Sequence, residues 1–162
     1  MKDRLKKSTL KVLGYSFVHG ESLLKDLKKN SDRCYPLYGV VDYKIYTNQG
    51  TLHVTTLSPF AFDGRSGPKL VDWYVPNLGS FEEILCWLTH DANAYGKDLS
   101  FKDTNVLLYA MLRDLPKYRP TKATVIQLAV SVDSSWYGEP KPTDWCYANR
   151  GLVFTEWLPP LV

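Results

Sequence analysis

The alternation of hydrophobic and polar positions is clearest between residues 37 and 57. β-Branched and aromatic side chains dominate residues 37–46, and this run stops at Asn48-Gln49-Gly50. A second run of the same kind covers residues 51–57. Two strand-like runs joined by a short loop that contains glycine are typical of a β-hairpin. We therefore predict two antiparallel strands in this part of the chain.

A helix is predicted from about residue 81 to residue 95. The hydroxyl of Ser80 can accept a hydrogen bond from a free backbone N–H, and Glu83 reaches back to complete a capping box. Gly96 suits the left-handed conformation that ends many helices. Between these ends, apolar side chains recur at three- and four-residue spacing, which is typical of one buried helical face. They are Ile84, Leu85, Leu88, Ala92 and Tyr95.

Three further helices follow from the same kind of pattern. Ser100 and Asp103 open a second capped helix, which Pro116 ends because proline lacks the backbone donor that a helix needs. A third helix is predicted from residue 122 to about residue 134. Residues 22–29 form a short amphipathic run that predicts a small helix before the hairpin.

The order of the elements, with strands first and helices after them, predicts an α+β fold with segregated layers. We expect an N-terminal β-hairpin or small antiparallel sheet packed on about three helices, followed by an irregular C-terminal segment. In that segment residues 138–144 are rich in proline and glycine, and residues 152–154 suit an edge strand. A chain of 162 residues can bury a core on its own, so a single domain over residues 1–162 is expected.

Composition and charge narrow the classes of function. The net charge is +3, and the basic residues concentrate within residues 2–11 and 25–29, where solvated helical faces explain them better than phosphate contacts. Nucleic-acid binding is therefore not favoured. Three cysteines without short paired spacing argue against a disulfide framework and favour a reducing compartment. No signal peptide and no long apolar run is present, so we expect neither signal-directed secretion nor a membrane span.

The first candidate site is the loop Asp63-Gly64-Arg65-Ser66-Gly67-Pro68. Its two glycines allow a sharp turn, and Asp63, Gly64 and Ser66 can present oxygens or backbone N–H groups to a cation or an oxyanion. An ordinary surface turn has the same composition. The loop alone therefore does not define a function.

The second candidate site is the pair His90-Asp91 on the predicted helix. Adjacent helical residues point about 100 degrees apart, so we expect these two side chains to serve different partners. His90 is a candidate general base or a core histidine held by one hydrogen bond, and Asp91 is a candidate metal ligand or an exposed helical aspartate. Zinc is disfavoured because His19, His53 and His90 show no paired ligand spacing.

The order of these motifs resembles a phage and prophage family known as domain of unknown function 1353, over residues 36–137. The shared features are the loop Asp63-Gly64-x-Ser66-x-Pro68, the helix with His90-Asp91, and the capped helix after Ser100. The resemblance implies a β-hairpin that leads into the loop, three helices and a phage origin. It also implies that Tyr95 belongs to the site, although Tyr95 lies five residues after His90 where the family pattern has four.

The same order is similar to that of the small secretory phospholipases, which implies roles for individual residues. His90 would activate a water molecule, Asp91 would help bind calcium together with Asp63 and the rest of the loop, and a more distant aspartate would orient the histidine. In this chain Asn105 stands where that aspartate belongs, and Asp103 stands at the capping acid, so Asn105 or Asp103 is the expected orienting residue. An amide can hold the ring but cannot stabilise an imidazolium as a carboxylate does.

Two hypotheses follow from the residues and the resemblance together. The first is a non-catalytic phage protein, either a virion component or a factor that binds a phage or host protein, built on a degenerate hydrolase-like site. The surplus of aromatic side chains near the C-terminus favours such a partner. The alternative is a calcium-assisted hydrolase, such as a phospholipase-like esterase, with His90 as its base. Either protein is expected in the host cytoplasm or the virion, and the sequence does not define its oligomeric state.

Overall fold

The computed structural model describes residues 3–27, 35–62, 80–131 and 153–161. Within these residues the strands form one four-stranded antiparallel sheet in the order β1-β3-β4-β6 and one two-stranded sheet of β2 and β5. The strands are β1 Val12–His19, β2 Tyr35–Leu37, β3 Val41–Thr47, β4 Gly50–Thr56, β5 Phe60–Phe62 and β6 Val153–Leu158. The helices are α1 Glu21–Lys25, α3 Phe81–Gly96, α4 Phe101–Asp114 and α5 Pro120–Ser131. The predicted α+β fold is confirmed.

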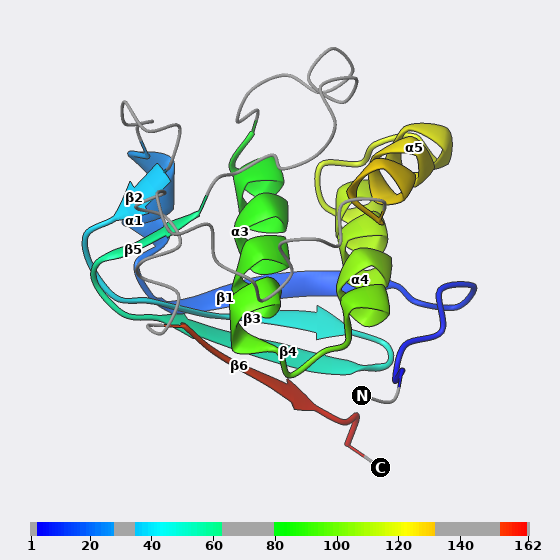
Figure 1. Cartoon of the computed structure of the whole chain (residues 1–162), viewed down its shortest axis with the longest axis horizontal. Coiled ribbons are helices and arrows are strands. Elements are labelled where there is room, and N and C mark those ends of the chain that lie inside the picture. The colour runs from blue at the N-terminus through cyan, green and yellow to red at the C-terminus, as the bar shows by residue number, and fades with distance from the viewer. Residues whose placement is uncertain (1–2, 28–34, 63–79, 132–152, 162) are drawn as a thin grey trace.

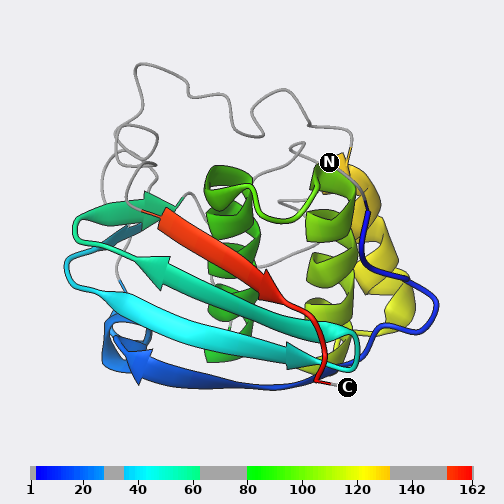
Figure 2. The same cartoon turned by 90° about the horizontal axis from the view of Figure 1, so that it is seen from below.

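The helices and the larger sheet form separate layers. Helices α3 and α4 lie side by side over one face of the sheet, and α5 packs against α4 (Figure 1). Seen from below, the four strands stand in front of both helices, and β6 forms one edge of the sheet (Figure 2). This arrangement encloses the apolar core between the sheet and the helices. Among the described residues, every helix is too short or too polar to span a bilayer.

The central hairpin of β3 and β4 confirms the hairpin that the sequence predicts. Its strands pair from Val41 with Thr56 to Thr47 with Gly50, and the buried side chains alternate along both strands. Tyr43 is fully buried on the helix side, whereas Asp42, its neighbour in the chain, lies on the other face. A period of two is what a sheet with one covered face requires. The predicted first strand extended back to residue 37, but Leu37 belongs to β2.

The two outer strands of the large sheet were predicted less well. No strand was expected at β1, because bulges between Val12 and Gly14 and between Phe17 and His19 break the alternation of buried and exposed side chains. At the other edge, β6 runs on to Leu158, beyond the predicted residues 152–154. The predicted edge strand is therefore confirmed, and it is longer than predicted. The predicted loop over residues 138–144 lies outside the described residues.

The predicted helix starts are confirmed by their caps. Ser80 Oγ accepts a hydrogen bond from the Glu83 N–H at 3.3 Å, and Ser100 Oγ accepts one from the Asp103 N–H at 3.1 Å. The end of α3 differs from the prediction, because Lys97, and not Gly96, adopts the left-handed conformation, with φ of 58°.

Gly96 serves close packing. A Cβ atom added at Gly96 would lie 2.8 Å from Thr155 Cβ on β6. The absence of a side chain at Gly96 therefore allows α3 to approach the edge strand of the sheet. The other two predicted helices differ mainly in their ends. The one expected from residue 122 begins at Pro120. The one expected over residues 22–29 is α1, which begins one residue earlier and ends at Lys25.

Candidate functional site

The centre of the candidate site is a hydrogen bond between α3 and α4. His90 Nε2 lies 2.9 Å from Asn105 Oδ1, and the two residues are only 5% and 2% exposed. An amide oxygen accepts hydrogen bonds and does not donate them, so with Oδ1 facing the ring the proton sits on Nε2. This contact fixes the plane of the imidazole and leaves Nδ1 as the other ring nitrogen that can accept or carry a proton.

Asp91 lies beside that second nitrogen. Its Oδ1 atom is 3.4 Å from His90 Nδ1, and the residue is completely buried. The expectation that adjacent helical side chains would serve different partners was therefore incomplete, since the two side chains do approach each other. A separation of 3.4 Å is at the long end for a hydrogen bond between nitrogen and oxygen. Asn105 thus holds the ring through Nε2, and the Asp91 carboxylate, which only accepts, can form a hydrogen bond with Nδ1 when that nitrogen carries a proton.

A further polar contact next to His90 ties α3 to the sheet. The hydroxyl groups of Tyr43 and Thr89 lie 2.8 Å apart in the buried interior. Burial raises the pKa of Tyr43 well above its ordinary value, so the phenol stays protonated and can donate this bond. Neither residue was predicted to belong to the site. The available signals were the core position of Tyr43 in the predicted strand and the place of Thr89 directly before His90.

Asp103 lies apart from this cluster. Its carboxylate accepts hydrogen bonds from the backbone N–H groups of Arg4 at 2.6 Å and Leu5 at 3.1 Å. Asp103 and Asn105 are two positions apart on α4, so their side chains point about 200 degrees apart around the helix. The structure therefore brings Asn105, and not Asp103, to the histidine ring. Asp103 instead anchors the N-terminal segment to the first turn of α4.

Tyr95 faces β5. Its ring meets the ring of Phe60 edge-on, with centroids 5.8 Å apart and an interplanar angle of 78°. The five-residue spacing from His90 places Tyr95 on a different side of α3 from the histidine. Phe60 opens the short buried strand that ends directly before residue 63. The remaining predicted site residues, Asp63, Gly64 and Ser66, lie outside the described residues.

The described residues supply few ligands for a metal ion. No group of three or more His, Cys, Asp or Glu side chains in this part of the chain is arranged to hold one. Calcium binds six to eight oxygen atoms, and of the two carboxylates expected to hold it only Asp91 is described. The donors that the structure describes therefore do not complete a calcium site. His53, one of the other histidines considered, binds Asp42 Oδ1 through Nε2 at 2.6 Å on the uncovered face of the sheet.

No family model, no curated protein and no solved structure matches this chain. The geometry offers an oriented and buried imidazole between two helices, held by an amide where a catalytic histidine is more often held by a carboxylate. It also offers a fully buried carboxylate beside the ring.

Proposed function

We propose that this chain is a non-catalytic phage protein, a virion component or a factor that binds a phage or host protein, whose polar core descends from a hydrolase-like site. The observation that carries the proposal is the contact between His90 Nε2 and Asn105 Oδ1. A general base becomes positively charged when it takes a proton, and a neutral amide stabilises that charge less than a carboxylate does. The phage origin rests on the motif resemblance alone.

The burial of the polar cluster supports a structural role. His90 is 5% exposed and Asp91 is not exposed, so a substrate would have to displace neighbouring protein to reach them. Buried polar groups that are mutually hydrogen-bonded also fix how two helices pack, because any other packing would leave them unsatisfied. In this proposal His90 and Asn105 set the relation of α3 to α4, and the molecule acts through its surface.

The alternative is a calcium-assisted hydrolase in which His90 is the base, and one observation favours it. With Nε2–H donating its hydrogen bond to Asn105 Oδ1, a neutral His90 carries its lone pair on Nδ1, the nitrogen that would accept a proton from water. In this alternative Asp91 and Asp63 would hold the calcium ion, and the rest of the loop would complete its shell. The two proposals differ in whether the wild-type protein turns over any ester.

The test compares three proteins: wild type, Asn105→Asp and His90→Gln. Each is assayed on phospholipid vesicles and on a soluble ester, with and without millimolar calcium. The non-catalytic proposal expects no turnover by the wild type above the level of His90→Gln. Turnover that depends on calcium and is lost in His90→Gln would overturn it in favour of the hydrolase. A gain of turnover in Asn105→Asp alone would support descent from an active site, because it restores only the carboxylate.

A binding measurement tests the positive part of the proposal. The wild-type protein is run on size exclusion with and without phage particles and with host lysate. A virion component or a host-binding factor is expected to migrate with a larger species, and the same species should be recovered with His90→Gln if that variant folds. Migration as the free protein under all these conditions would contradict the proposal.

A further inference from the structure

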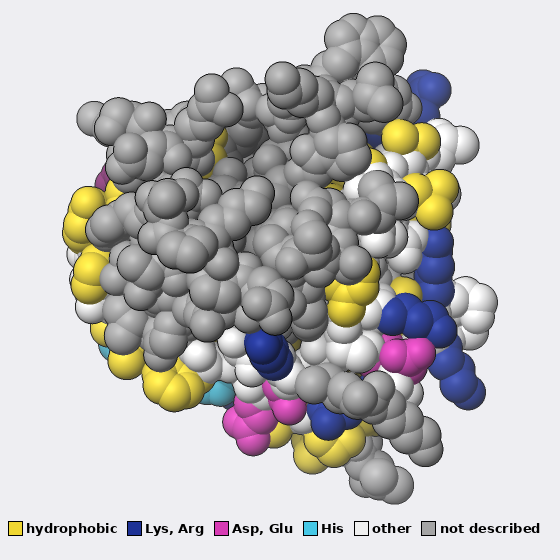
Figure 3. All heavy atoms as spheres, viewed as in Figure 1, with side chains coloured by type: hydrophobic (Ala, Val, Ile, Leu, Met, Phe, Trp, Pro, Cys, Tyr) yellow, Lys and Arg dark blue, Asp and Glu magenta, His cyan; other side chains and the backbone are white. Residues whose placement is uncertain are grey.

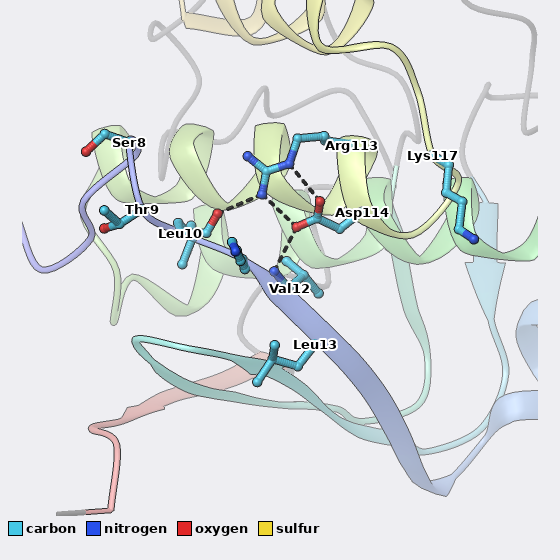
Figure 4. A pocket seen from close by; sticks show the side chains of 9 residues that line it. Ser8, Thr9, Leu10, Val12, Leu13, Arg113, Asp114 and Lys117 are labelled. Carbon is cyan, nitrogen blue, oxygen red and sulfur yellow. Dashed lines mark hydrogen bonds and ion pairs between the residues drawn. The ribbon is translucent and has the colours of Figure 1, made fainter.

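A groove of about 480 Å³ lies between residues 8–13 and the C-terminal end of α4, away from His90. Figure 4 shows Ser8 and Thr9 at one end of it, Lys117 at the other, and the side chains of Arg113 and Asp114 between them. Hydroxyl groups therefore lie at one end of the groove and a cation at the other, and Leu10, Val12 and Leu13 add apolar surface to its lining. Nothing in the proposed function uses it.

The middle of the groove has a fixed wall. Arg113 Nε and Nη2 each donate a hydrogen bond of 2.7 Å to the carboxylate of Asp114, and Nη2 also donates one of 2.7 Å to the Leu10 carbonyl oxygen. The Val12 N–H donates to Asp114 Oδ2 at 2.8 Å. The charges of Arg113 and Asp114 offset each other, so the net charge of the groove comes from its other residues.

Lys11 and Lys117 supply that charge. Both residues are exposed, and no ion pair within the described part of the chain engages either of them. The backbone at Lys11 is held by Asn48, whose Oδ1 accepts from the Lys11 N–H at 2.8 Å and whose N–H donates to the Lys11 oxygen at 3.1 Å. Lys117 occupies the left-handed region with φ of 59°, a conformation that costs free energy for a residue with a side chain. Two exposed lysines that form no ion pair with the described residues thus project from backbone that is held in place.

The surroundings of the groove are strongly basic. Residues 3–13 and 113–122 together contain eight basic and two acidic residues, a surplus of six, whereas the whole chain has a net charge of +3. Lysine and arginine side chains gather along the edge of the molecule on this side (Figure 3). The summed field of such a cluster attracts anions and raises their local concentration.

We propose that this groove binds the phosphate groups of an elongated ligand that carries several negative charges. Lysine binds phosphate as a point charge, and hydroxyl groups add hydrogen-bond donors. Thr9 Oγ1 accepts a hydrogen bond from Gln49 Nε2 at 3.0 Å and keeps its own proton to donate, and Ser8 lines the same end of the groove. A ligand with phosphates spaced along its length meets the hydroxyl groups at one end and Lys117 at the other.

The probe is inorganic tripolyphosphate, titrated into the full chain and followed by NMR chemical shifts and by calorimetry. We compare the wild type with the double variant Lys11→Gln/Lys117→Gln and with the charge-matched control Lys25→Gln/Lys44→Gln, whose lysines lie outside the groove. Wild type and control are expected to bind, with shifts in the amides of residues 8–13 and 113–117. The groove variant is expected to bind about tenfold more weakly, and added salt should weaken binding.

The outcomes show whether the groove binds phosphate and whether that phosphate belongs to a free ligand or to a lipid headgroup. Equal binding by the groove variant and the control would overturn the proposal, as would binding of sulfate as tight as that of tripolyphosphate at equal ionic strength. Vesicles of phosphatidylglycerol and of phosphatidylcholine form a second arm. Binding of the anionic vesicles through Lys11 and Lys117 without binding of free tripolyphosphate would assign the phosphate to a lipid headgroup. Absence of binding to every probe would also overturn the proposal.

Discussion

His90 Nε2 on α3 lies 2.9 Å from Asn105 Oδ1 on α4, and this bond joins two helices at a point where both side chains are buried. Removing one partner of a buried hydrogen bond leaves the other without compensation for its lost hydration. The bond is therefore expected to contribute to stability whether or not the protein is an enzyme.

The first prediction concerns this bond. Asn105→Ala is expected to destabilise the protein by about 1–3 kcal/mol, because it leaves His90 Nε2–H in the interior without its acceptor. Urea unfolding followed by circular dichroism measures the change. A double-mutant cycle with His90→Ala isolates the pair, and additive losses in the cycle would mean that the two side chains do not interact in solution.

Asp103 gives a second prediction, on the attachment of the N-terminal segment. Asp103→Ala removes the acceptor of the Arg4 and Leu5 N–H groups and is expected to destabilise the protein by about 1–3 kcal/mol. Hydrogen exchange at the Leu5 amide should rise at the same time. The control is Asp26→Asn, which changes an exposed carboxylate at the end of α1 and is expected to have little effect. Unchanged exchange at Leu5 in Asp103→Ala would show that the segment is held by other contacts.

The sequence predicted the parts of the fold that follow a regular period or a local capping rule. Ser80 and Ser100 begin their helices as predicted, because a cap depends on residues within one turn. β1 was missed because its two bulges disturb the alternation that marks a strand. The role of Gly96 was also misjudged, since its need for close packing comes from Thr155, 59 positions later in the chain. Contacts over such separations leave no local pattern.

In the candidate site, too, contacts between residues far apart in the chain were predicted less well than local patterns. The resemblance to the secretory phospholipases implied Asn105 or Asp103 as the residue beside His90, and the structure brings Asn105 there. The sequence could not decide between them without the packing of α3 on α4. The bond between Tyr43 and Thr89 was missed for a related reason, because it joins the predicted hairpin to a helix whose position over the sheet is set only by the folded core.

Gly96 supports a third prediction. Gly96→Ala places a methyl group against the Thr155 side chain, which is β-branched and cannot turn away freely, so the end of α3 must move from β6. Such overpacking typically costs about 1–3 kcal/mol, although alanine favours a helix by itself. Thermal unfolding of Gly96→Ala, Thr155→Ala and the double variant measures it. Thr155→Ala should recover part of the loss, and a Gly96→Ala variant as stable as the wild type would contradict the close approach.

A fourth prediction concerns Cys86, the one cysteine among the described residues. Its thiol is fully buried on α3, and burial raises its pKa well above the ordinary value, so the reactive thiolate is scarce in the folded protein. Iodoacetamide at pH 8 is expected to leave Cys86 unlabelled under native conditions and to label it in urea. Peptide mass spectrometry measures the labelling. Native labelling as fast as that in urea would show that α3 opens to solvent readily.

The last prediction concerns acid and the contact between Val12, at the start of β1, and Asp114, at the end of α4. Burial alone would raise the pKa of Asp114, but hydrogen bonds from Arg113 and from the Val12 N–H outweigh burial and lower it below its ordinary value of 3.8. A carboxylate with a lowered pKa stabilises the folded state above its unfolded value, and this stabilisation is lost as the pH falls through the folded value. The wild type should therefore lose stability as the pH falls below about 4, by more than Asp114→Asn does. Chemical unfolding from pH 6 to pH 2.5 measures both slopes, with Asp26→Asn, an exposed aspartate, as the matched control. Parallel curves for the wild type and Asp114→Asn would mean that the pair of Arg113 and Asp114 contributes nothing to acid sensitivity.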